Sequence, residues 1–196
     1  ESLNHNRTRF SVLHEVGHYV LPNHEHTLYV CDDRGLNFRT RLWMEKEANE
    51  FAAELLFLGD RFAVEANSLP VSAATVYQLA TKYEASFEAT ARRLVERNFK
   101  SCILVVFKED STGARIDSDR QSTWSVRYCI ASPLFKTRYF ERIQGFVPKE
   151  IVATVTTPGR NLVDSVTTEI EIGSPQAGTE TSFQAEFFSN TYNIFC

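Results

Sequence analysis

The residues with the clearest capacity for chemistry are the histidines, and all five lie within the first 26 residues of the 196-residue chain. His14, Glu15 and His18 form the pattern H-E-x-x-H. Residues four apart lie on one face of a helix, so both imidazoles can reach one metal ion, and Glu15 can approach a water molecule on that ion. This is the arrangement of a zinc hydrolase, which adds a third protein ligand and leaves one position open.

A glutamate on a second helix is one source of the third ligand. The stretch 42–58 is rich in helix-forming residues and has one apolar stripe that includes Phe51. Counting back four residues from Phe51 puts Glu47 at the edge of the buried face. We expect Glu45 and Glu50 to project away from it.

A histidine is the alternative source of the third ligand. In the longer pattern H-E-x-x-H-x-x-G-x-x-H, the third histidine follows the second by six residues, and that position is His24 here. The pattern needs a glycine at position 21 for a sharp turn, but this chain has Leu21 followed by Pro22. Glu47 is therefore the favoured candidate, and we expect His24 and His26 to be exposed loop residues.

The spacing of apolar residues predicts four helices in the first half of the chain. They cover Arg9–Leu21, Leu42–Leu58, Pro70–Lys82 and Ser86–Asn98. The last two are short and close together, which is the spacing of a helix-turn-helix. Because residues 69–100 carry five basic and three acidic residues, we expect this segment to act as a scaffold or docking element, and DNA binding is the less favoured alternative.

After Lys100 the pattern changes from helical to alternating, which predicts a mainly β region with one helix near Lys136–Gln144. The predicted strands are Ile103–Phe107, Trp124–Ile130, Glu169–Ile172 and Phe183–Phe188. The chain is therefore predicted to be an α+β protein.

Composition narrows the class of protein further. The net charge of -4 argues against a generic polyanion binder, and no apolar run is long enough to span a membrane. The four cysteines form no C-x-x-C pair, which indicates thiols in a reducing compartment. We therefore expect a cytoplasmic protein, and because the chain begins at Glu1 without a methionine, we expect native residues before it. No feature indicates an oligomeric state.

Two segments carry a family resemblance. Arg9–Leu21, with the sequence RFSVLHEVGHYVL, and Glu45–Leu56, with the sequence EKEANEFAAELL, resemble the two motifs of the ImmA/IrrE family of bacterial and phage metallopeptidases. The resemblance implies that His14, His18 and Glu47 bind zinc and that Glu15 is the general base. Manganese and ferrous iron also suit two histidines and one carboxylate.

The resemblance also implies a function and a domain order. Members of the family cleave a helix-turn-helix transcriptional repressor and so switch on stress-response, DNA-damage-response or mobile-element genes. The IrrE type implies a zincin-like peptidase domain over 1–68, truncated at its N-terminus, a helix-turn-helix-like segment over 69–99 and a GAF-like sensor domain over 100–196.

Two other functions are compatible with the residues. One is a non-enzymatic helix-turn-helix regulator whose metal site is structural or degenerate. The other is a secreted metzincin-like protease, which would need His24 on the metal and disulfides among the four cysteines.

Overall fold

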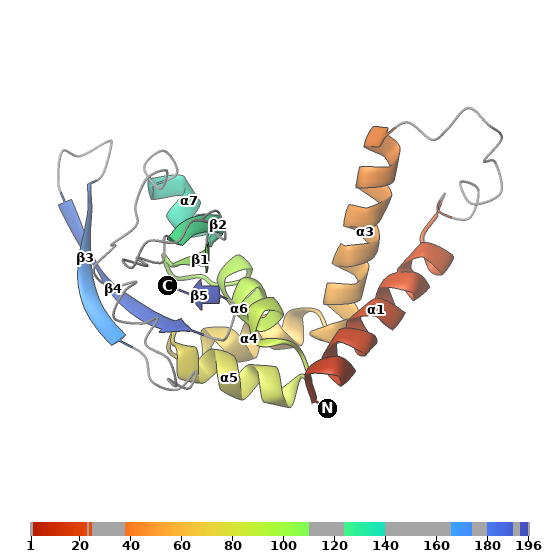
Figure 1. Cartoon of the computed structure of the whole chain (residues 1–196), viewed down its shortest axis with the longest axis horizontal. Helices are drawn as coiled ribbons and strands as arrows, with labels where there is room; N and C mark the ends of the chain where they lie inside the picture. The colour runs from red at the N-terminus through yellow and green to blue at the C-terminus, as the bar shows by residue number, and fades with distance from the viewer. Residues whose placement is uncertain are drawn as a thin grey trace, which may run out of the picture. The chain divides into compact units, whose positions relative to one another are not determined.

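The computed structural model describes residues 2–22, 24, 38–109, 124–139, 166–173, 180–189 and 193–195. Its helices are α1 (Ser2–Val20), α3 (Phe38–Leu56), α4 (Asp60–Asn67), α5 (Ala73–Lys82), α6 (Phe87–Glu96) and α7 (Pro133–Tyr139), labelled in Figure 1. Its strands are β1 (Ile103–Glu109), β2 (Trp124–Ala131), β3 (Val166–Gly173), β4 (Glu180–Ser189) and β5 (Asn193–Phe195). The mixture of helices and strands confirms the predicted α+β class.

The chain divides into two compact units, and the division runs through α5 and α6. The first unit contains Glu1–Ser68 and Gln78–Thr90, and the second contains Leu69–Tyr77 and Ala91–Cys196. The predicted helix-turn-helix-like segment over 69–99 is thus shared between the units. The three predicted domains themselves stay a prediction.

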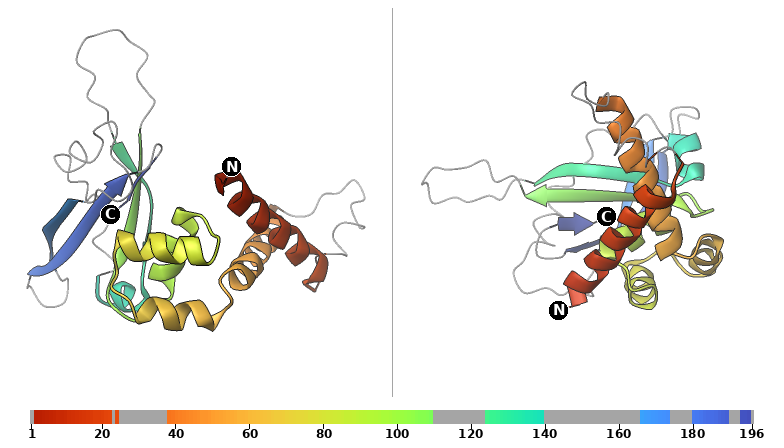
Figure 2. Two further views of the ribbon diagram at one scale, coloured as in Figure 1. Left: turned by 90° about the horizontal axis from the view of Figure 1, so that it is seen from below. Right: turned by 90° about the vertical axis from the view of Figure 1, so that its right-hand side faces the viewer.

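In the first unit, α1 and α3 lie side by side in every view (Figures 1 and 2). They approach closely at Gly17, where an added Cβ would lie 3.1 Å from Cδ1 of Phe51 and 3.2 Å from Cα of Ala48. These distances are shorter than ordinary van der Waals contact, so a larger residue at this position would require α3 to shift by a few tenths of an ångström. The contact lies between the two histidines of α1 and within the glutamate-rich part of α3, so it brings both sets of polar residues together.

Polar contacts fix the first half of α1 to the end of α5. Nδ2 of Asn6 donates a hydrogen bond to the carbonyl of Ala85 (3.1 Å), and Nη1 of Arg9 donates to the carbonyl of Tyr83 (3.2 Å) and to Oε2 of Glu84 (2.7 Å). Carbonyls at a helix C-terminus lack partners within the helix, so these donors satisfy groups that would otherwise need water.

Three aromatic residues form the large-side-chain core of the first unit. Phe57, Phe62 and Tyr83 pack with ring centroids 4.7 to 6.0 Å apart. The hydroxyl of Tyr83 donates to Oε2 of Glu65 (2.9 Å), whose other oxygen pairs with Lys82. Burial and this hydrogen bond raise the pKa of Tyr83 to about 12, while the bond from Lys82 holds the pKa of Glu65 below its usual value.

The described strands of the second unit form one antiparallel sheet in the order β2-β1-β5-β4-β3. Buried Ser132 joins its first two strands to α7: its backbone N–H donates to the carbonyl of Cys102 (2.9 Å), and its hydroxyl accepts from the N–H of Phe135 (3.2 Å) as the helix N-cap. Burial raises the pKa of the Cys102 thiol. Phe135 then packs against Tyr139 and Phe183.

The four predicted helices and four predicted strands are confirmed, with differences at their ends. The first helix begins at Ser2 rather than Arg9, because the contacts of Asn6 and Arg9 hold its early turns. The helix expected near Lys136–Gln144 begins at Pro133, and the positions after Tyr139 lie outside the described residues. Helix α4 and strand β5 were not predicted.

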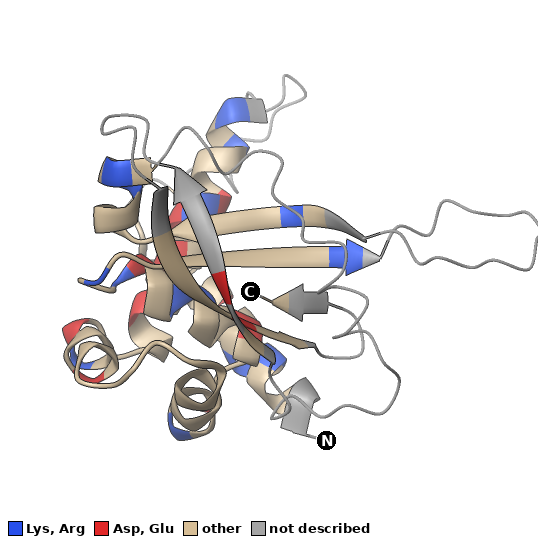
Figure 3. Cartoon of the chain, turned by 90° about the vertical axis from the view of Figure 1, so that its left-hand side faces the viewer, with Lys and Arg blue, Asp and Glu red and all other residues tan. Residues whose placement is uncertain are grey.

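Charged side chains of both signs are spread over the described residues. In the view of Figure 3, Lys and Arg are interspersed with Asp and Glu among the described residues. On α6, Arg93 is buried and Arg92 lies 3.8 Å from Glu96 and over the ring of Tyr128. Among the described residues, no helix has the length and apolar character that crossing a membrane requires.

Candidate metal centre

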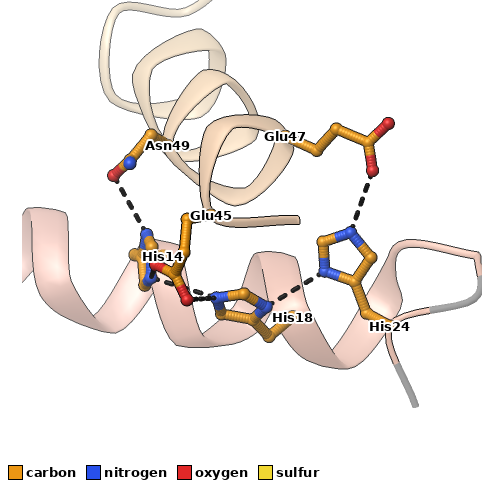
Figure 4. Close-up of polar contacts among 6 residues, drawn as sticks. All are labelled: His14, His18, His24, Glu45, Glu47 and Asn49. Atoms are coloured by element: carbon orange, nitrogen blue, oxygen red, sulfur yellow. Dashed lines mark hydrogen bonds and ion pairs between the residues drawn. The ribbon is translucent and has the colours of Figure 1, made fainter. Parts of the chain in front are cut away.

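Two helices bring three metal-binding groups to one point. The Nε2 atoms of His14 and His18, on α1, lie 3.1 Å apart. The carboxylate of Glu45, on α3, reaches both of them, with Oε2 3.3 Å from His14 and Oε1 3.4 Å from His18 (Figure 4). These three residues form a group that can hold one metal ion.

The spacing of the group fits a tetrahedral metal ion. Zinc binds nitrogen and oxygen at about 2.0–2.2 Å, so two ligand atoms on a tetrahedral zinc ion lie about 3.3 Å apart. The nitrogen–nitrogen distance and both nitrogen–oxygen distances are close to that value. The donor set of two imidazoles and one carboxylate also suits manganese and ferrous iron.

Glu45 was expected to project away from the buried face of its helix; its side chain is 58% exposed, but it lies on the side of α3 that meets the histidines, which the prediction missed. The prediction took Phe51 as the centre of the buried face of α3, whereas Ala48 and Ala52 are the fully buried residues there and Ala48 lies against Gly17. Glu45 is three residues before Ala48 and therefore lies on the face that meets α1.

Glu47, the third ligand implied by the resemblance, lies elsewhere in the structure. Its Oε2 is 3.0 Å from Nε2 of His24, and in Figure 4 it points to His24 and not to the histidine pair. Its role as a metal ligand stays a prediction, and so do those of His14 and His18. Glu15, the predicted base, has an exposed side chain.

The second atoms of the two imidazoles also have partners. Nδ1 of His14 lies 3.1 Å from Oδ1 of Asn49, and Nδ1 of His18 lies 3.0 Å from Nδ1 of His24. His24 is 1% exposed, so the expectation that it is an exposed loop residue is wrong, while His26 lies outside the described residues.

Sequence reasoning missed Asn49 as a partner of His14. The available signal was its position four residues after Glu45, which puts both on one face of α3. No comparable signal exists for His24, because it lies outside both long helices and its position depends on how the chain leaves α1.

Comparison with known families gives one match. A peptidase family model described as an IrrE N-terminal-like domain matches residues 1–95. The match covers α1, α3 and the histidine–glutamate group, and continues through α5 and nearly all of α6. No curated protein matches the chain.

Proposed function

Because residues 1–95 belong to the ImmA/IrrE family of metallopeptidases, we propose that the chain is a zinc-dependent peptidase whose metal ion is held by His14, His18 and Glu45. The observation that carries this proposal is the convergence of two imidazole nitrogens and one carboxylate, each nitrogen lying within 3.4 Å of a carboxylate oxygen, which is close to the spacing of ligands on a tetrahedral ion.

The chemistry follows from the positions of the side chains. A divalent ion in such a site polarises a peptide carbonyl and makes water acidic. Glu15 is next to His14 on α1 and is exposed to solvent, so its carboxylate is available to take a proton from the attacking water and pass it to the leaving amine. His14, His18 and Glu45 would hold the ion.

Glu47 is the competing third ligand. The family resemblance supports it, but its carboxylate would have to leave His24 to reach the metal ion. Measuring the zinc affinity of the full chain and three variants separates the candidates. We expect Glu45→Gln to weaken zinc binding far more than Glu47→Gln, and Glu50→Gln, an exposed position on the same helix, to leave it unchanged. The opposite ranking of the first two would make Glu47 the ligand.

The proposed substrate is a helix-turn-helix transcriptional repressor in the cytoplasm, whose cleavage switches on stress-response or mobile-element genes. Family membership supports this class of substrate. We further propose that residues 100–196 form a GAF-like sensor that controls the peptidase, which the mainly β content of that region supports.

Cleavage itself is tested with the repressor encoded nearest to the chain's gene. Incubation with the zinc-loaded full chain is expected to yield two fragments, whose masses identify the broken bond. Glu15→Gln should keep its zinc and cut about 10²- to 10⁴-fold more slowly, since it removes only the base. A zinc-loaded wild-type chain that binds promoter DNA but cuts no repressor would favour the non-enzymatic regulator instead.

A further inference from the structure

A chain of polar contacts leads from the metal group to the solvent. It starts at His18, whose Nδ1 lies 3.0 Å from Nδ1 of His24, and continues to Glu47, whose Oε2 lies 3.0 Å from Nε2 of His24. Figure 4 shows that His24 lies between the other two and contacts both. His24 is 1% exposed, whereas the Glu47 side chain is 58% exposed.

With Glu47 ionised and both imidazoles neutral, the chemistry of these groups sets the direction of each hydrogen bond. An ionised carboxylate only accepts, so Nε2 of His24 must carry the proton that points to Glu47. A neutral imidazole has one N–H, so Nδ1 of His24 is an acceptor, and the proton between the two rings belongs to Nδ1 of His18. Nε2 of His18 is then left with a free lone pair, and it is the atom that faces His14 and Glu45.

We propose that His24 and Glu47 form a positioning relay that holds His18 in the tautomer whose Nε2 binds the metal ion. The proposal rests on the proposed function for the identity of the metal ligands. Metal-binding histidines commonly donate their other N–H to a carboxylate or carbonyl group, which orients the ring and raises its basicity. Here the carboxylate acts through a second histidine, and Glu47 serves the metal centre without touching the ion.

His14 is oriented by a separate and shorter contact. Its Nδ1 lies 3.1 Å from the amide oxygen of Asn49, which only accepts, so the same logic leaves Nε2 of His14 free for the metal. The two imidazoles are thus fixed from opposite sides. Burial makes the His24 contacts consequential, because a buried imidazole that loses its partners bears a desolvation cost.

The first test reads the tautomers directly and needs no metal. Nitrogen NMR of the metal-free full chain, at alkaline pH where imidazoles are neutral, distinguishes protonated from unprotonated ring nitrogens. We expect the proton on Nδ1 of His18 and on Nε2 of His24. A proton on Nδ1 of His24 would reverse the chain and overturn the relay.

The second test measures the zinc affinity of full-length variants. His24→Ala should raise the Kd for zinc about 10- to 100-fold, the usual effect of losing such a supporting group. His24→Gln should recover most of that loss, because its amide oxygen accepts and its amide N–H donates in the same order. His5→Ala, an exposed histidine on the same helix α1, should change nothing. Unchanged affinity in His24→Ala would overturn the proposal.

A double variant separates a relay from direct binding by Glu47. If Glu47 acts only through His24, the variant with both His24→Ala and Glu47→Gln should bind zinc no more weakly than His24→Ala alone. Additive losses would mean that Glu47 contacts the ion itself and would overturn the relay.

Failure of the proposed function has a different signature. A wild-type chain that binds no zinc, or a Glu45→Gln variant that binds it as tightly as wild type, would contradict the metal centre. The tautomers measured in the metal-free chain judge the relay separately.

Discussion

The two helices that carry the metal group and the second unit differ in the size of the side chains at their main contacts. In the first unit, Gly17 of α1 lies against the backbone of Ala48 on α3. In the second unit the fully buried side chains are large, among them Phe135 and Phe187. Small residues allow two helices to approach closely enough for their polar side chains to converge. Large residues bury more apolar area and therefore favour stability over close backbone approach.

The first unit keeps its own large residues away from the metal group. Phe57, Phe62 and Tyr83 gather where α3 ends and α4 begins, beyond the part of α3 that carries Glu45 and Asn49. The residues around the metal group and the large buried aromatic residues thus lie at different positions along α3.

The largest effect is expected from Phe135→Ala in the second unit. Phe135 is fully buried between Tyr139 and Phe183, and truncating a buried phenylalanine costs about 3–5 kcal/mol. Denaturant unfolding should show this loss, while zinc affinity of the folded chain stays unchanged. Phe99→Ala, at a position 78% exposed, is the matched control and should unfold like wild type.

A fall in zinc affinity in the folded Phe135→Ala variant would contradict the separation of the two units. It would mean that the sheet supports the metal group, and the contrast between small-residue and large-residue packing would no longer mark a functional division.

A smaller effect is expected from Gly17→Ala in the first unit. The added methyl group would meet Phe51 and Ala48 at 3.1 and 3.2 Å, and overpacking of this kind costs about 1–3 kcal/mol. Alanine recovers about 0.5–1 kcal/mol through better helix propensity, so we expect a net loss near 1 kcal/mol. Because the helices must separate slightly, zinc should also bind more weakly in a titration.

The control for that variant is Ser11→Ala, at an exposed position on the same helix. It should keep wild-type zinc affinity. If Gly17→Ala also kept it, close approach of α1 and α3 would not be what builds the metal group.

The parts that sequence predicted well have strong local signals. The apolar stripe of 42–58 is periodic over several turns, and the two histidines of H-E-x-x-H are one helical turn apart; these patterns located both helices of the metal group. Strand β5 was missed because three residues give no usable alternation. The C-terminal region was recognised as mainly β, but the order of its strands depends on long-range pairing that no local pattern contains.

The parts of the site that were predicted wrongly depend on which face of α3 is buried and on contacts between residues far apart in the sequence. Choosing Phe51 as the centre of the α3 face rotated the expected site by about one residue and exchanged the roles of Glu45 and Glu47. A bulky residue suggests the centre of a buried face, but at a close helix crossing alanine and glycine occupy it. The burial of His24 follows from the path of the chain after α1, which propensities do not determine.

An effect on stability of similar size to that of Gly17→Ala, without any on zinc affinity, is expected from Glu65→Gln, which tests whether polar contacts stabilise the first unit away from the metal group. Glu65 is 23% exposed and accepts from Lys82 and Tyr83, so its loss should cost about 0.5–1.5 kcal/mol at neutral pH. Because Lys82 holds the pKa of Glu65 below its usual value, this contribution is present above that value and is lost as pH falls through the lowered pKa. Unfolding curves of wild type and variant should therefore differ at neutral pH and converge in acid, whereas Glu50→Gln should match wild type throughout. A difference that persists unchanged in acid would assign the effect to packing and not to the carboxylate's charge.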